Sequence, residues 1–190
     1  MMMRLVLLVS LALASAVTNA GLPRDSVYHW SATVQDQDGS TVRWSELHGT
    51  VRIVTMFYSS CPHACPMIVE TIKAIESRLP VAERTRLRVG LLSFDYERDT
   101  PSRLKKVAGE RSIDTSRWHL YRTDDAAARH LGGLLGIQYR KLADGEFNHS
   151  SVLILLDANG RILARSDRMG VPDPKFVAAV RRALAASSNE

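Results

Sequence analysis

The stretch that decides the fold runs from residue 51 to residue 66 and reads Val51-Arg52-Ile53-Val54-Thr55-Met56-Phe57-Tyr58-Ser59-Ser60-Cys61-Pro62-His63-Ala64-Cys65-Pro66. Its first half is a continuous run rich in β-branched and apolar residues, which is typical of a buried central strand. The end of the stretch favours a helix that starts at Pro66, because proline suits the first helical position. Four apolar residues then follow at the spacing of one helix face: Ile68, Ile72, Ile75 and Leu79. The stretch predicts a strand, a short loop with two cysteines, and a helix.

Strand and helix patterns alternate on both sides of this stretch. Upstream, we expect a hairpin between residues 28–34 and 41–44 with Asp38-Gly39 at its turn, then a helical turn at 45–47. Downstream, we expect helices at 101–109, 124–135 and 174–186, and strands at 87–94, 118–121, 137–142, 152–156 and 162–166. Such alternation implies a sheet covered on both faces. Tight turns at Asp144-Gly145 and Asn159-Gly160 join the last strands, so the sheet should be mixed.

The first twenty residues have the pattern of a secretory signal. Arg4 supplies a positive charge, residues 5–16 are almost wholly apolar, and Thr18-Asn19-Ala20 ends the segment with small residues. A membrane span needs about 20 apolar residues, so cleavage is favoured over an uncleaved anchor. We therefore expect residues 1–20 to be a signal peptide and residues 21–190 to be one domain. The protein should be periplasmic or otherwise exported, and soluble after cleavage unless the segment stays as a membrane anchor.

The composition is ordinary for a globular domain. Hydrophobic residues make up 45% and charged residues 24%, and the formal net charge is +5. The basic residues are scattered, without the aromatic-interleaved basic stretch that would indicate nucleic-acid binding. A mildly basic surface would favour an acidic partner, but a solvated helix face explains the charge equally well.

Cys61 and Cys65 are the two cysteines of the sequence, and their spacing indicates chemistry rather than a structural staple. An exported protein meets an oxidising space, but a disulfide that closes so short a loop constrains the unfolded chain little. The helix that begins beside them favours a thiolate over a thiol, which lowers the cysteine pKa. The loop also follows a central strand, and open α/β sheets place their sites at the carboxyl ends of strands.

Two close thiolates can form a reversible disulfide, or they can bind a soft metal such as copper(I), zinc or iron–sulfur. Redox pairs usually have two residues between the cysteines, whereas this pair has three, which leaves more room for an ion. A metal held by two sulfurs needs a third ligand, and His149 is the best candidate of six histidines: His29, His48, His63, His119, His130 and His149. It lies in a loop just before the strand expected at 152–156. Two thiolates and one imidazole suit copper(I), and the imidazole also accommodates copper(II). From the residues alone, a surface histidine without a metal is an equally good interpretation of His149.

Four segments together resemble the SCO/SenC family. They are Gln35-Asp36-Gln37-Asp38-Gly39, Phe57 to Pro66, Asp95-Tyr96-Glu97-Arg98-Asp99-Thr100-Pro101, and His149-Ser150 ahead of Asp157-Ala158-Asn159-Gly160-Arg161. Their order and spacing match the family over nearly all of the chain after the signal. The cysteine spacing alone is a weak signal. Its combination with the 95–101 loop and a late His-Ser pair is specific.

The resemblance implies a thioredoxin-like α/β fold with a mixed central sheet flanked by helices and an N-terminal β-hairpin. It implies copper, as Cu(I) or Cu(II), bound by Cys61, Cys65 and His149. The implied function is a copper chaperone, not an enzyme with turnover, that serves the copper-bearing subunit of a respiratory cytochrome oxidase or another cuproprotein. Another copper chaperone is a further candidate partner. The alternative functions are a thiol–disulfide oxidoreductase that uses Cys61 and Cys65 to reduce client cysteines, and a copper-dependent redox sensor.

Two positions depart from the family pattern: His63 stands where the family usually has Asp, and Tyr96 where it usually has Pro. His63 is a candidate for a further ligand or a partner contact, and an exposed loop residue is the alternative. Asp95 is a candidate for shaping the site or contacting a partner, and a strand-end cap is the alternative. Asp99 is expected to cap the helix at 101–109, and Met67 to pack in the core.

Overall fold

Five strands form a central sheet in the order β5-β4-β3-β8-β9. They are β3 (Arg52–Phe57), β4 (Arg88–Ser93), β5 (Trp118–Tyr121), β8 (Leu153–Leu156) and β9 (Ile162–Ser166). β4 runs parallel to β3 and to β5, whereas β8 runs antiparallel to β3 and to β9. The expected mixed sheet is therefore confirmed. Every residue of β3 is buried, as its continuous apolar run predicts.

The protein is seen in a computed structural model, which describes residues 21–61 and 64–187. The expected signal peptide, residues 1–20, lies outside the described residues, as does His63. The side chains of Ala64 and Cys65 also lie outside the description, although both residues belong to a helix. No helix in the described ranges is long and apolar enough to cross a membrane.

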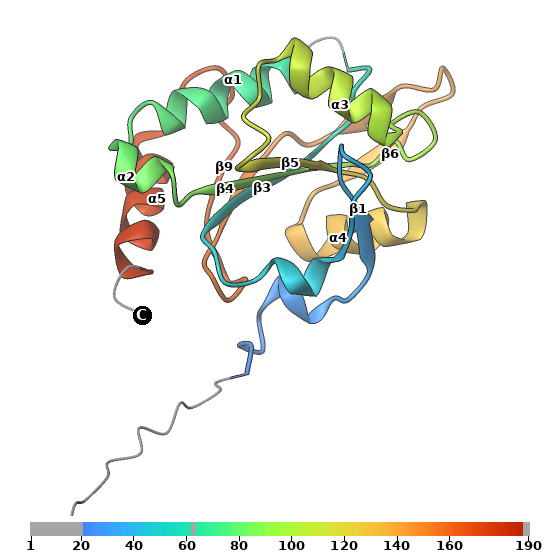
Figure 1. Cartoon of the computed structure of the whole chain (residues 1–190). Helices are drawn as coiled ribbons and strands as arrows, with labels where there is room; N and C mark the ends of the chain where they lie inside the picture. The colour runs from blue at the N-terminus through green and yellow to red at the C-terminus, as the bar shows by residue number, and fades with distance from the viewer. Residues whose placement is uncertain (1–20, 62–63, 188–190) are drawn as a thin grey trace, which may run out of the picture.

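Helices cover both faces of the sheet, as expected (Figure 1). α1 (Ala64–Glu76) and α3 (Pro101–Glu110) lie above the sheet in this view, and α4 (Asp125–Leu135) lies below it. Both parallel crossovers, β3 to β4 and β4 to β5, step in the same direction across the sheet. Because such crossovers are right-handed, α1 and α3 fall on the same face. α2 (Val81–Arg84) contacts α5 (Pro174–Ala186), which also packs against β9.

The N-terminal part forms the expected β-hairpin. β1 (Thr33–Gln35) pairs with β2 (Thr41–Arg43), and Gly39 takes a φ of +84° at the turn. The first strand is shorter than predicted, because residues 27–29 form a 3₁₀ helix, η1 (Val27–His29). The Ser26 side chain starts this helix by accepting a hydrogen bond from the Tyr28 N–H at 3.1 Å. The expected helical turn is present as η2 (Trp44–Leu47).

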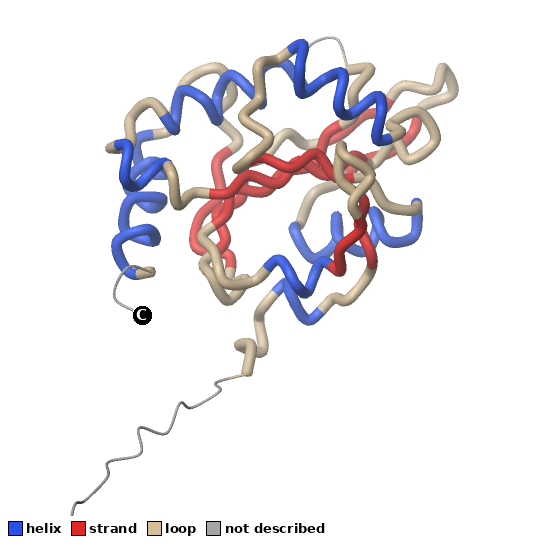
Figure 2. Tube along the Cα trace, in the orientation of Figure 1, coloured by secondary structure: helices blue, strands red, loops and turns tan. Residues whose placement is uncertain are grey.

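A second small hairpin corrects the prediction for the segment between residues 137 and 151. β6 (Tyr139–Lys141) pairs with β7 (Phe147–His149), and the two form a sheet of their own. The strand predicted at 137–142 therefore joins β7 rather than the central sheet, and residues 147–149 are a strand rather than a loop. The β6 label of Figure 1 marks the place of this hairpin, and Figure 2 draws its strands in red and its turn in tan. We call residues 139–149 the His149 hairpin below.

Candidate metal centre

Three segments meet at one edge of the central sheet. Phe57 and Ser93 are paired residues at the carboxyl ends of the parallel strands β3 and β4, so the loops that follow them leave the sheet together. β8 runs antiparallel to β3, so its first residue, Leu153, lies toward this same edge. His149 comes four residues before Leu153. The topology therefore carries the His149 hairpin to the edge where the cysteine loop begins.

Cys61 lies in the loop between β3 and α1, three residues before the helix starts. It is 8% exposed, and its N–H donates a hydrogen bond to the Tyr58 carbonyl at 3.3 Å. A cavity of about 30 Å³ borders it, walled partly by Pro66 and Val69 of α1. Cys65 is the second residue of α1, where unpaired N–H groups and the helix dipole give a positive potential.

His149 is the last residue of β7 and is half-buried. Its ring packs edge-on against Tyr58, with ring centroids 5.7 Å apart, and at a tilt against Phe94, with centroids 5.2 Å apart. Its Nδ1 lies 3.4 Å from the Ser150 carbonyl oxygen. His149 is therefore held by packing and strand pairing, unlike the loop histidine that the sequence predicted.

Tyr58 lies between the two halves of the site. Its hydroxyl donates a hydrogen bond to Glu146 Oε2 at 2.9 Å, and its ring contacts His149. Burial raises the pKa of Tyr58, and hydrogen bonding with Glu146 and with Cys61 raises it further. Tyr58 therefore contacts both Cys61 and His149 and stays neutral at physiological pH. The sequence showed Tyr58 only as the end of a strand, and no local signal marks this role.

Asp99 holds the cysteine loop and does not cap α3, so that expectation is wrong. It is fully buried, and its carboxylate accepts hydrogen bonds from the Ser59 N–H at 2.9 Å, the Ser59 hydroxyl and the Ser93 hydroxyl at 2.5 Å. The cap is Thr100, whose hydroxyl accepts from the Arg103 N–H at 3.2 Å. Because Thr100 directly precedes the first helical residue, Asp99 is one position too early to cap, and its side chain bonds Ser59 instead.

Asp95 is buried, 1% exposed, and forms an ion pair with Arg98. Arg98 in turn donates hydrogen bonds to the Gly145 carbonyl at 2.8 Å and to Glu146 Oε1 at 3.3 Å. Burial alone would lower the pKa of Arg98, but hydrogen bonds and charges from Asp95 and Glu146 raise it overall. Asp95 is thus paired with a cation that also bonds the turn between β6 and β7, and its role in shaping the site stays a prediction.

Met67 does not pack in the core, because 43% of it is exposed on the first part of α1. Within the described side chains, no group of three or more His, Cys, Asp or Glu residues is gathered as a metal site. That set does not include His63 or the Cys65 side chain, so the ligand set Cys61, Cys65 and His149 stays a prediction.

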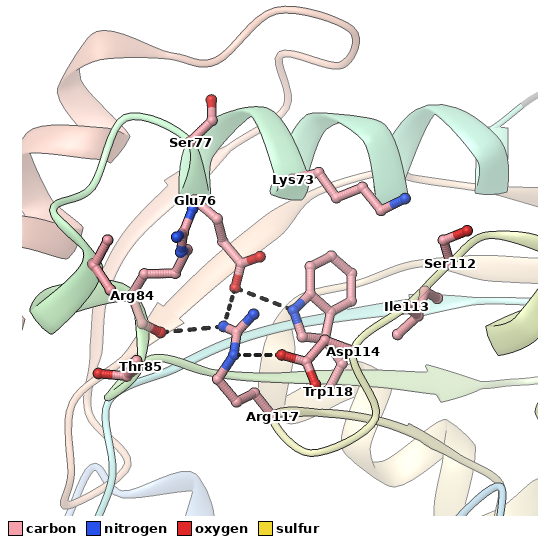
Figure 3. Close-up of a pocket in the computed structure, with 11 residues that line it drawn as sticks. Lys73, Glu76, Ser77, Arg84, Thr85, Ser112, Ile113, Asp114, Arg117 and Trp118 are labelled. Atoms are coloured by element: carbon pink, nitrogen blue, oxygen red, sulfur yellow. Dashed lines mark hydrogen bonds and ion pairs between the residues drawn. The ribbon is translucent and has the colours of Figure 1, made fainter.

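A larger groove of about 480 Å³ lies at the other end of α1 and holds a different kind of arrangement (Figure 3). Arg117 donates to Glu76 Oε1 at 2.6 Å and to the Arg84 carbonyl at 3.1 Å, and its Nε bonds Asp114 at 2.8 Å. The Trp118 indole also donates to Glu76, at 3.1 Å. These side chains satisfy one another's hydrogen-bonding groups. The groove is therefore lined by a structural ion-pair network, at the end of α1 opposite to the cysteines.

The fold and the site define a thioredoxin-like domain. A cysteine pair lies at the start of its first long helix, and the strand that ends at His149 lies at the sheet edge where the cysteine loop begins. The family model for SCO1/SenC matches residues 28–185, so the chain belongs to the SCO1/SenC family.

Relatives and solved structures agree with this assignment. The chain is 25% identical over 147 residues to the SCO1 protein homolog of Bacillus subtilis (strain 168), covering 76% of this chain and 75% of the relative. It resembles copper-bound ScoI of Bradyrhizobium japonicum with a TM-score of 0.68 and 20% identity, over 80% of this chain and 97% of that one. It also resembles BsSco, a member of the Sco family of cytochrome c oxidase assembly proteins with a disulfide switch. That match has a TM-score of 0.68 and 23% identity, over 81% of this chain and 91% of the other. At these identities, the two structures establish the fold.

Proposed function

We propose that the protein is an exported copper-binding chaperone for assembly of the copper centre of a respiratory cytochrome oxidase. Copper is its cargo, held by the sulfurs of Cys61 and Cys65 and an imidazole nitrogen of His149. It passes to the cysteines and histidines of a client by ligand exchange. The client is the copper-bearing oxidase subunit or another cuproprotein, and another copper chaperone is a candidate donor.

One observation carries this proposal: Tyr58 contacts both Cys61 and the His149 ring, although 88 residues separate Cys61 from His149. A thiolate and an imidazole near one another form a donor set that suits copper in either valence. The positive end of α1 favours the thiolate form that a metal requires. Family membership supports the same function, as does the copper bound in the Bradyrhizobium relative.

Copper affinity in the purified, reduced protein tests the proposal. One equivalent of copper is added without oxygen, and affinity is measured by competition with a chromophoric chelator for wild type, His149→Ala and His130→Ala. His130 is a matched control, since its ring stacks on Trp30 at 5.7 Å in another part of the molecule. We expect His149→Ala to weaken binding by at least about tenfold, which is 1.4 kcal/mol, and His130→Ala to leave it unchanged. Wild-type binding no tighter than that of a dithiol peptide would contradict the proposal.

A thiol–disulfide oxidoreductase is the second candidate function, because a cysteine pair at a helix start is also suited to disulfide exchange. The disulfide switch of BsSco supports this alternative. A reductase should reduce a disulfide substrate catalytically, lose this activity in Cys61→Ser, and keep it in His149→Ala. A chaperone should instead lose copper in His149→Ala.

We also propose that residues 1–20 are a signal peptide and that residues 21–190 act outside the cytoplasm, in the periplasm. The charged start, apolar run and small residues at 18–20 support cleavage before Gly21. Mass spectrometry of the protein recovered from the periplasm of a bacterial host tests this. A mass that includes residues 1–20, together with membrane association, would indicate an uncleaved anchor instead.

A further inference from the structure

The His149 hairpin pairs with itself and not with the central sheet. β6 and β7 contribute three residues each to a two-stranded sheet. A two-stranded hairpin is at best marginally stable by itself, so its position depends on what anchors it. One anchor is aromatic: Tyr139 stacks on Phe94 with centroids 4.6 Å apart, and Phe147 packs on Tyr58 at 5.1 Å. Such packing allows rings to slide, so a directional anchor is also needed to place His149.

Arg98 supplies directional contacts to the turn of this hairpin. Its guanidinium donates to the Gly145 carbonyl at 2.8 Å and to Glu146 Oε1 at 3.3 Å, and it bonds the buried carboxylate of Asp95. Asp95 belongs to the loop that follows β4, so the guanidinium joins that loop to the turn between β6 and β7. A planar group with five donors can make all these contacts at once, which a lysine ammonium cannot do with the same geometry.

The same guanidinium covers the ring of Tyr58, which contacts His149, and the ring of Phe147, which lies two residues before His149 on β7. Its central carbon lies 5.9 Å from the Tyr58 ring centroid and 5.8 Å from that of Phe147. Glu146, which Arg98 holds, also accepts the hydrogen bond of the Tyr58 hydroxyl. Arg98 therefore contacts the cysteine side of the site, through Tyr58, and the histidine side, through Gly145, Glu146 and Phe147.

We propose that Arg98 is a positioning residue that holds the His149 hairpin against the cysteine loop and so presets the imidazole beside Cys61. The expected effect of Arg98 on copper affinity rests on the proposed function. The expected effect of Arg98 on the position of the hairpin is independent of that function. Arg98 touches neither Cys61 nor His149 in any described contact, so it acts on the site through Glu146, Tyr58 and Phe147.

A matched pair of variants tests this role. Arg98→Met removes the charge and the donors but keeps an apolar stem, while Arg98→Lys keeps the charge without the planar fork. The control is Lys141→Met, because Lys141 on the same hairpin forms an exposed ion pair with Glu97 at 2.6 Å. Both ion pairs join the hairpin to the 94–100 loop. The backbone of Lys141 pairs with that of Phe147, but the Lys141 ammonium, unlike the Arg98 guanidinium, has no described contact with the Tyr58 ring or the Phe147 ring.

The first readout is hydrogen exchange in the metal-free protein. In Arg98→Met we expect amides of residues 139–149 to exchange on the order of tenfold faster while those of β3 and β4 are unchanged. Arg98→Lys should fall between this variant and wild type, and Lys141→Met should differ from wild type by less than about twofold. Unchanged exchange of the hairpin in Arg98→Met would overturn the proposal, whatever the protein binds. Loss of protection throughout the sheet would overturn it too, since Arg98 would then stabilise the whole fold.

The second readout is copper affinity in a double-mutant cycle. Groups that orient metal ligands typically change affinity by 10–100-fold when removed, so we expect a loss of about tenfold in Arg98→Met. The loss of copper affinity caused by His149→Ala should be smaller in the Arg98→Met background than in wild type, because the imidazole is already misplaced there. Strictly additive losses would contradict positioning of His149. If wild type and His149→Ala bind copper equally, the proposed function fails, and the exchange experiment still decides the role of Arg98.

Discussion

The Tyr58 hydroxyl donates a hydrogen bond of 2.9 Å to Glu146, which lies 88 residues later in the chain. Tyr58 follows directly on β3 and precedes Cys61, whereas Glu146 precedes the strand that ends at His149. The bond therefore ties the sulfur side of the candidate centre to its imidazole side. Arg98 reinforces it by bonding Glu146 from the 94–100 loop.

Replacing Tyr58 by Phe should destabilise the fold by about 1–2 kcal/mol, because Glu146 loses a hydrogen bond to a buried group while the ring stays in place. The control is Tyr139→Phe. The Tyr139 hydroxyl is buried without a hydrogen-bond partner among the described residues, so its removal should be neutral or stabilising. Urea unfolding of both variants measures the difference. Equal losses would show that the Tyr58–Glu146 bond contributes nothing specific.

Asp99→Ala should destabilise the protein by about 3 kcal/mol, because three donors from Ser59 and Ser93 lose a buried charged acceptor. The Ser59 amide should also exchange faster with solvent. Asp25→Ala is the comparison, since the Asp25 side chain is 70% exposed and pairs only on the surface with Arg161. That change should cost less than about 1 kcal/mol. A small effect of Asp99→Ala in thermal and urea unfolding would refute the assigned role.

Gly160→Ala should be far more costly than Gly39→Ala, although both glycines have nearly the same φ, +81° and +84°. At residue 160, a Cβ would collide with the Tyr28 ring and lie 2.6 Å from Ser26 Oγ, whereas at residue 39 nothing lies within 4 Å. The left-handed backbone alone costs about 1–2 kcal/mol, and overpacking adds about 1–3 kcal/mol at residue 160. Comparison of the two free energies of unfolding checks this. Equal values would mean that the N-terminal segment shifts freely.

His119 should make the fold less stable as the pH falls below about 6.5, the usual pKa of histidine. Burial lowers the pKa of His119, and Arg52 lowers it further, against a raising effect of Asp36. The unfolded chain then takes up the proton before the folded chain does, so stability rises with pH in this range and falls as the medium is acidified. His119→Gln should remove this part of the pH dependence between about pH 5 and pH 7. The free energy of unfolding is measured with urea at each pH. If its pH dependence were the same in His119→Gln and wild type, a contribution of His119 would be excluded.

Several elements could be predicted because their signals are local. The helix α4 begins after Asp124, which accepts a hydrogen bond from the Ala127 N–H at 2.8 Å, and ends at Gly136 with a φ of +63°. Its cap, its apolar spacing and its glycine all lie within the segment itself. The buried run of β3 and the turn at Gly39 are likewise properties of short stretches. Such signals also placed Cys61 in the loop after β3 and predicted the helix beyond it, although α1 begins at Ala64 and already includes Cys65.

β7 could not be predicted, because the three residues of this strand carry no alternating pattern and its stability comes from pairing with β6 and from packing on Phe94. Asp99 was misassigned for a related reason. A cap and a long-range acceptor look the same in sequence, and the choice depends on whether Ser59, 40 residues earlier, lies within reach. Met67 was misassigned because helical spacing does not tell which face of α1 stays uncovered.

The sequence by itself determined the order of the five central strands and of the long helices and placed the cysteine pair at the start of a helix, since each depends on residues close together in the chain. Only the tertiary structure decided that His149 lies on a strand, that Tyr58 contacts both it and Cys61, and that Arg98 and Asp99 hold the two sides in place. The contacts of Tyr58 with His149, of Arg98 with Gly145 and of Asp99 with Ser59 join residues 40 to 91 positions apart. Their partners are selected by which strand ends share a sheet edge, a property of the folded topology that no local pattern of residues contains.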